Sequence, residues 1–149
     1  MKTTQRQEGT ALEQTEIFRP LMALVGWTLC VLLLIPYQRF KAAFAGRVTS
    51  HDFRLGESER VPPEVRLPNR NFQNLLEMPL LFYVVCLVGY LGQQIDTTAL
   101  ALAWSYVALR VLHSLVHLTY NGIVHRFLVF ATSNVVLLLL WARVLVALP

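Results

Sequence analysis

Charged and amide side chains recur at helical spacing inside an apolar stretch of this 149-residue sequence. Arg70, Asn74 and Glu77 are spaced i, i+4 and i+7, which places them on one face of a helix. A guanidinium group binds a carboxylate through a planar fork, and a carboxylate can hold an ammonium group. This set therefore suits a small ligand that carries both signs of charge.

A second set of polar residues lies in the next apolar stretch. Arg110, His113 and His117 follow at i, i+3 and i+7, and Tyr120 and Asn121 extend the same face. Arg126 opens the following stretch at the same depth. A free thiol has a pKa near 8.5, and a neighbouring arginine or protonated histidine lowers it. Arg126, helped by His113 or His117, is therefore suited to stabilise a thiolate if the bound ligand carries a thiol.

These polar residues have two interpretations, a structural ion pair or a functional pocket, because burying charge in a membrane is costly. Each ionisable group at bilayer depth costs at least about 2.5–3.5 kcal/mol, so such groups usually face protein or water. Glu77 and Arg110 could form a structural ion pair between helices, and Asn74 alone could be a helix–helix hydrogen bond. The convergence of at least six polar side chains favours a functional pocket, which could include such a pair.

Two of these histidines also have a spacing that can bind metal. His113 and His117 form an H-x-x-x-H pair, which can ligate from one helix face. A single pair is a weak signal, and His51 and His125 do not form another. We predict no metal site, with a metal oxidoreductase using His113, His117 and Glu77 as an alternative hypothesis.

The composition indicates that lipid surrounds most of the chain. Hydrophobic residues make up 55% and charged residues 15%, with a mean hydropathy of +0.49. A soluble domain averages roughly 25% charged residues, and a domain of this size keeps much of its surface in water. These values exclude a soluble globular enzyme and a disordered chain. The net charge of +4 is spread out, which predicts no nucleic-acid partner.

Four apolar segments predict an all-α integral membrane bundle, since about 20 such residues span a bilayer. The predicted spans cover about residues 17–37, 71–91, 98–120 and 127–148, with a long polar loop over about residues 38–70. A proline is tolerated in a first helical turn, as at Pro20. Pro36 should kink or end its helix. Pro62–Pro63 and Pro68 read as extended or turning chain.

The basic residues predict the orientation of the bundle. Four spans place the first and third connections on one face and both termini on the other. Eight basic residues flank the first face: Arg39, Lys41, Arg47, Arg54, Arg60, Arg66, Arg70 and Arg126. Four flank the other face: Lys2, Arg6, Arg19 and Arg143. Because Lys and Arg favour the cytoplasmic side, we expect the 38–70 loop to be cytoplasmic, in the inner membrane if the source is bacterial.

Two motifs resemble the family of membrane-associated proteins in eicosanoid and glutathione metabolism, from about residue 39 to 148. The first is Arg-Asn-Phe-Gln-Asn-Leu-Leu-Glu-Met-Pro over residues 70–79. The second is Arg-Val-Leu-His over residues 110–113, followed by His117 and Arg126. The first motif looks most like uncharacterised bacterial members.

The resemblance implies a homotrimer of four-helix protomers that binds glutathione between neighbouring protomers, near the cytoplasmic side. By position, three residues are implied to be catalytic: Arg126, His113 and His117. The implied glutathione-binding residues are Arg70, Asn74, Glu77, Arg110, His113, His117, Tyr120, Arg126 and Arg39, where Lys41 could replace Arg39. Several members have a tyrosine at the position of His117, and one has a serine at that of Phe127. These differences argue against an eicosanoid substrate.

Two hypotheses of function follow. The first is a glutathione-dependent transferase or peroxidase, in which a lipophilic electrophile arrives from the lipid and meets the glutathione thiolate. The alternative is a non-catalytic lipid-binding or scaffolding protein of the same fold. Glutathione discriminates between them, because a scaffold could bind lipid without it.

Overall fold

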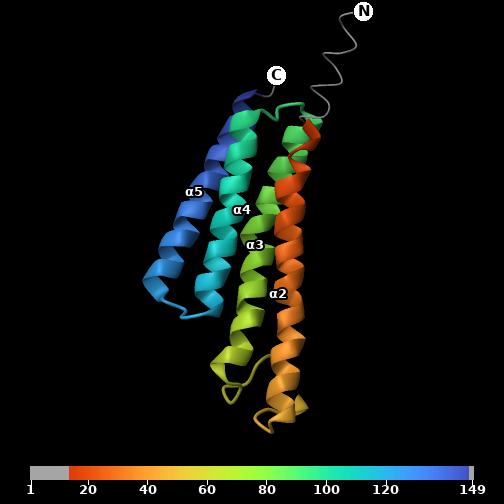
Figure 1. The fold of residues 1–149 in the computed structure, drawn as a ribbon, viewed down its shortest axis with the longest axis vertical. Helices are drawn as coiled ribbons and strands as arrows, with labels where there is room; N and C mark the ends of the chain where they lie inside the picture. The colour runs from red at the N-terminus through yellow and green to blue at the C-terminus, as the bar shows by residue number, and fades with distance from the viewer. Residues whose placement is uncertain (1–13, 148–149) are drawn as a thin grey trace, which may run out of the picture.

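The computed structural model describes residues 14–147 as a bundle of four long helices (Figure 1). In chain order they are α2 (Phe18–Phe44), α3 (Pro63–Leu91), α4 (Thr97–Leu118) and α5 (Ile123–Ala147). A short 3-10 helix, η1 (Ser50–Phe53), lies between α2 and α3. The α2–α3 and α4–α5 connections lie at one end, and the α3–α4 connection lies at the other (Figure 1). This is the up-and-down arrangement that the apolar segments predict.

The helices run beyond several of the predicted boundaries. Pro36 does not end its helix, because α2 continues through it to Phe44. Pro68 lies within α3 and not in extended chain, although Pro62 is extended (ψ 147°) and Pro63 begins the helix. The connection between α2 and α3 therefore covers residues 45–62 and is shorter than expected. Prolines are tolerated inside helices when neighbouring groups satisfy the freed carbonyls.

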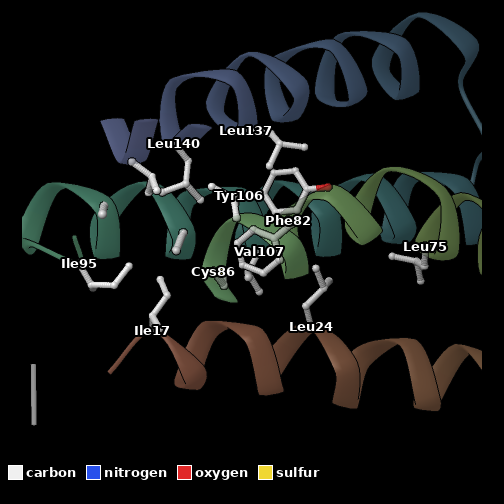
Figure 2. Packing of buried hydrophobic residues seen from close by; sticks show 14 of the residues in the cluster. Ile17, Leu24, Leu75, Phe82, Cys86, Ile95, Tyr106, Val107, Leu137 and Leu140 are labelled. Carbon is white, nitrogen blue, oxygen red and sulfur yellow. The ribbon is translucent and has the colours of Figure 1, made fainter. Parts of the chain in front are cut away.

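The core forms where α2, α3, α4 and α5 meet (Figure 2). Leu24 of α2, Phe82 of α3 and Leu137 of α5 are all buried there. The rings of Phe82 and Tyr106 stack with their centroids 4.7 Å apart. Because a lipid tail is as apolar as leucine, close packing of this kind is what holds helices together in a membrane.

The outer surface of the bundle is apolar along its length. Exposed side chains include Leu33 on α2, Leu80 on α3, Leu112 on α4 and Leu138 on α5. All four helices are long and apolar enough to cross a membrane, by length and composition. The fold is therefore that of a multi-pass membrane protein.

Polar groups are paired at the end of the bundle that carries the α3–α4 connection. We call this the closed end and define it by Gln14, residues 92–96 and Arg143. Gln14 Nε2 donates to the Ile95 carbonyl oxygen at 2.8 Å, and the Ile95 backbone N–H donates to Gln14 Oε1 at 2.9 Å. Arg143 Nε donates to Asp96 Oδ2 at 3.1 Å. Each of these groups therefore has a partner within the protomer.

Asp96 also begins α4. Its Oδ1 accepts a hydrogen bond from the Ala99 backbone N–H at 2.8 Å, as an N-cap residue does. This bond, together with the Arg143 guanidinium, holds the pKa of Asp96 below its usual range. The contacts of the closed end thus join the segment before α2 to the α3–α4 connection, and the start of α4 to α5.

Candidate functional site

A cavity of about 510 Å³ opens among α3, α4 and α5, toward the end opposite the closed end. We call this region the cavity end. The cavity is lined by Arg70, Gln73, Asn74, Glu77, His113, His117, Ile123, Arg126, Phe127 and Phe130. Six of the residues that the sequence singles out therefore line one hollow.

The α3 wall repeats at helical spacing. Arg70, Gln73, Asn74 and Glu77 are spaced i, i+3, i+4 and i+7, so their side chains lie along one stripe. Asn74 Nδ2 donates to the Arg70 carbonyl oxygen at 2.9 Å. Within residues 14–147, the side chains of Arg70 and Glu77 make no hydrogen bond or ion pair. They are exposed charges of opposite sign, about two helical turns apart on the same wall.

The α5 wall carries a cation held at a tight turn. Arg126 Nη1 donates to Asn121 Oδ1 at 2.7 Å. Asn121 has a φ of +48°, a left-handed conformation that asparagine tolerates better than most residues. The turn thus brings the Asn121 side chain to Arg126 near the start of α5. Asn121 and Tyr120 follow the end of α4, so they do not extend its helical face as predicted.

The α4 wall contributes two buried histidines. The ring centroids of His113 and His117 are 5.9 Å apart, and both side chains are almost completely buried. Neither Nδ1 atom has a hydrogen-bond partner among the described residues. Buried polar groups are normally hydrogen-bonded, so both histidines retain capacity for a ligand or a water molecule.

Arg110 lies behind the cavity wall and does not line it. Its side chain is fully buried and donates from Nη2 to the backbone carbonyl oxygen of Asn74. Its Nε and Nη1 atoms have no partner in the described part of the chain. The ion pair with Glu77, which the sequence allows as an alternative, is not among the salt bridges of residues 14–147. The buried Arg110 guanidinium is therefore without a carboxylate partner among the described residues.

Two predicted binding residues lie outside the cavity of a single protomer. Arg39 Nη2 donates to Glu57 Oε1 at 3.0 Å, and its guanidinium carbon lies 4.6 Å from the centroid of the Phe53 ring. The Tyr120 hydroxyl is 3.1 Å from His125 Nδ1, and Tyr120 is exposed. Their predicted contacts with glutathione remain predictions.

The structure adds four lining residues to those predicted: Gln73, Ile123, Phe127 and Phe130. Gln73 lies three residues after Arg70, and Phe130 lies four residues after Arg126. Both therefore share a helical stripe with a predicted residue. Gln73 falls inside the stripe from Arg70 to Glu77, and Phe130 lies one turn beyond Arg126. Helical spacing would therefore have found both from the sequence.

A metal site and an anionic thiol ligand make different demands on this cavity. No group of three or more His, Cys, Asp or Glu side chains within residues 14–147 could hold a metal ion. The cavity instead offers two arginines for carboxylates and one glutamate for an ammonium group. It also offers two histidines with unpartnered nitrogens. The residues present thus fit a small peptide that carries carboxylates, an ammonium group and a thiol.

Comparisons with known proteins place the chain in a family. No curated protein and no solved structure matches it. The model of the MAPEG family matches residues 17–146, nearly the whole chain. That family is generally associated with glutathione, and it includes glutathione-dependent transferases and peroxidases as well as non-catalytic members. This four-helix membrane protein belongs to the MAPEG family.

Proposed function

We propose that this protein is a glutathione-dependent membrane enzyme that conjugates or reduces lipophilic electrophiles. The observation that carries the proposal is the cavity itself, which brings Arg70, Glu77 and Arg126 together with His113 and His117. None of the ion pairs within residues 14–147 engages these charged side chains. Membership of the MAPEG family supports glutathione as the ligand.

Each charged group of glutathione has a complement on the cavity wall. Arg70 and Arg126 would bind its carboxylates, because guanidinium groups bind carboxylates in bidentate fashion. Glu77 would hold its ammonium group, and Asn74 would add a hydrogen bond.

The reaction needs an ionised thiol and a route for its proton. The permanent charge of Arg126 favours the thiolate, and His113 or His117 would accept the proton. In conjugation, sulfur forms a bond to the electrophilic carbon while the leaving group departs with its bonding electrons. In reduction of a hydroperoxide, sulfur attacks the terminal oxygen, the O–O bond breaks and the alcohol leaves. A second glutathione then gives the disulfide and water.

Assembly into a homotrimer would complete this site. Arg39 lies outside the cavity of its own protomer, so we propose that it reaches the glutathione bound by a neighbouring one. The apolar outer surfaces of the helices would then be shared between protein contacts and lipid, from which the second substrate enters. Chemical crosslinking and native mass spectrometry in detergent test for three copies, and a stable monomer or dimer would contradict this assembly.

The cheapest test of the function uses protein in lipid nanodiscs. We expect saturable glutathione binding by isothermal titration calorimetry. We also expect loss of free thiol on adding a lipophilic electrophile such as 1-chloro-2,4-dinitrobenzene or cumene hydroperoxide. Absence of glutathione binding would overturn the proposal, because every role above depends on it.

A non-catalytic lipid-binding protein is the second candidate. It is favoured by Phe127, an apolar side chain directly after Arg126 on the cavity wall. Binding of lipid and glutathione without any thiol consumption, across both electrophiles, would support this candidate over the enzyme.

The orientation in the membrane is a further proposal. We propose that the 45–62 connection faces the cytoplasm, because of the excess of Lys and Arg on that side. A Ser50→Cys variant in which Cys30 and Cys86 are replaced by alanine tests it. An impermeant maleimide should label this cysteine in inside-out vesicles only. Labelling of intact cells from the outside would contradict the orientation.

A further inference from the structure

The Phe130 ring borders the cavity and lies close to the buried Arg110. It lines the cavity, and its centroid lies 5.6 Å from the Arg110 guanidinium carbon and 5.8 Å from the centroid of the His113 ring. The same ring therefore borders the ligand space and also contacts Arg110. Within residues 14–147, Phe130 supplies the only cation–π contact to the Arg110 guanidinium.

Two residues of α4, Arg110 beside Phe130 and Tyr106, carry hydrogen-bond donors with no acceptor among residues 14–147. Arg110 Nε and Nη1 and the Tyr106 hydroxyl have no partner among the described residues, and both side chains are fully buried. The two residues are i, i+4 neighbours on α4. Figure 2 shows the Tyr106 hydroxyl pointing toward the end of the bundle where Leu75 lies and away from Ile95. Buried donors without acceptors are costly, so this pair, which we call the inner donor pair, needs a complement.

We propose that Phe130 is a movable partition and that the inner donor pair binds the acceptor oxygen of a lipophilic substrate when the ring swings aside. The inference rests on the proposed function, because it names the class of second substrate that the same site takes. That class is a lipophilic oxygen compound, such as a carbonyl compound or a hydroperoxide.

Depth and surroundings favour a lipophilic molecule over glutathione at the inner donor pair. Arg110 precedes the end of α4 by eight residues, which is about 12 Å along a helix. The neighbouring core is apolar and includes Phe82 and Leu137. The outer cavity already supplies both signs of charge for a peptide ligand. A molecule dissolved in the bilayer can reach this depth, and only its oxygen would need donors.

The hydrogen-bond donors determine which substrates suit this pair: those with an oxygen that accepts hydrogen bonds. A guanidinium group donates hydrogen bonds and accepts none, so an alkane or a simple alkyl halide would leave its N–H groups unpaired. A carbonyl or peroxide oxygen supplies lone pairs while its hydrocarbon chain stays in lipid. Phe130 would close over the same donors when no substrate is bound, through the contact between cation and ring.

The test uses 2-undecanone as the probe, in nanodiscs without glutathione. Infrared spectra should show a second carbonyl band at lower wavenumber than that of the ketone in empty nanodiscs, because hydrogen bonding weakens the C=O bond. Phe130→Trp should abolish this band by fixing the partition, and Phe130→Leu should strengthen it. Tyr106→Phe should weaken probe binding roughly two- to tenfold, as expected for one hydrogen bond.

The matched control is Tyr90→Phe, which removes a tyrosine hydroxyl near the closed end and should leave the band unchanged. Circular dichroism checks that each variant remains helical. The proposal is overturned if the native protein gives no shifted band, or if the band survives in both Phe130→Trp and Tyr106→Phe. Glutathione calorimetry on the same samples is independent of this result, so failure of the inner donor pair and failure of the proposed function are distinguishable.

Discussion

The two ends of the bundle treat buried polar groups in opposite ways. At the closed end, the buried amide of Gln14 makes two hydrogen bonds to the Ile95 backbone. At the cavity end, the buried amide of Asn71 has no partner on either its nitrogen or its oxygen within the described chain. One end therefore pairs its polar groups, whereas the other holds polar groups that have no partner among residues 14–147.

The arginines show the same difference. Arg143 is paired with Asp96 at the closed end. Arg70, Arg110 and Arg126 at the cavity end make no ion pair within residues 14–147. Unpaired charge in a membrane is expensive, so its concentration at one end indicates that something outside the protomer completes it. The polar groups of the closed end are paired with one another, and we propose that those of the cavity end bind a ligand.

The largest expected effect is a loss of glutathione affinity when residues of the cavity end are substituted, with no loss at the closed end. Arg126→Ala and Glu77→Ala should each weaken glutathione binding by about 2–5 kcal/mol, the usual loss when one partner of a buried charge pair is truncated. Arg143→Ala is the matched control at the closed end and should leave the affinity unchanged. Titration calorimetry measures all three.

Glu77→Ala needs a second measurement because it could disturb assembly near the buried Arg110. Size-exclusion chromatography of each variant therefore accompanies the calorimetry. Unchanged affinity in both cavity variants, with native assembly, would show that the site is wrongly assigned.

The next effect compares the two buried amides. Gln14→Leu should lower the free energy of unfolding by about 1–3 kcal/mol, because it removes both bonds to the Ile95 backbone. Asn71→Leu should raise it by up to a similar amount, since it replaces an unpartnered amide with an apolar group of similar size. Unfolding by SDS in mixed micelles gives both values. Destabilisation by Asn71→Leu would mean that this amide has a partner outside the described protomer.

The smallest effect is the pH dependence contributed by Asp96. The Ala99 N–H and Arg143 lower the pKa of this carboxyl in the folded state. Its contribution to stability is therefore present above the unfolded value near 3.8 and is lost as the pH falls through the lower folded value. Because the group is more than a third exposed, we expect only about 0.2–1 kcal/mol. Asp96→Asn should remove this component of the acid dependence, and identical pH profiles for the two proteins would contradict it.

Helical periodicity predicted most of the site because its residues repeat within single helices. Arg70, Asn74 and Glu77 occupy one stripe, and His113 and His117 occupy another, so spacing alone grouped them. Spacing does not show which stripes meet across helices or where a turn ends a helix. Tyr120 was therefore assigned to a helical face, although it follows the end of α4.

The remaining differences arise from contacts that local sequence does not encode. Pro36 reads as a helix end, yet α2 continues through it to Phe44 and packs against α3. Arg39 could have faced the cavity by its position near the end of a span, but Glu57 and Phe53 from the following connection hold it elsewhere. An ion pair between Arg110 and Glu77 was one of two interpretations, but Arg110 instead bonds to the Asn74 backbone.

The central claim is that the cavity end is a glutathione site, and density for the bound tripeptide tests it most directly. The measurement is an electron cryo-microscopy map of the protein in nanodiscs with saturating glutathione. We predict density in the cavity between Arg70, Glu77 and Arg126, with the thiol toward Arg126. Glutathione density at another surface, or a lipid chain filling this cavity in its place, would contradict the account.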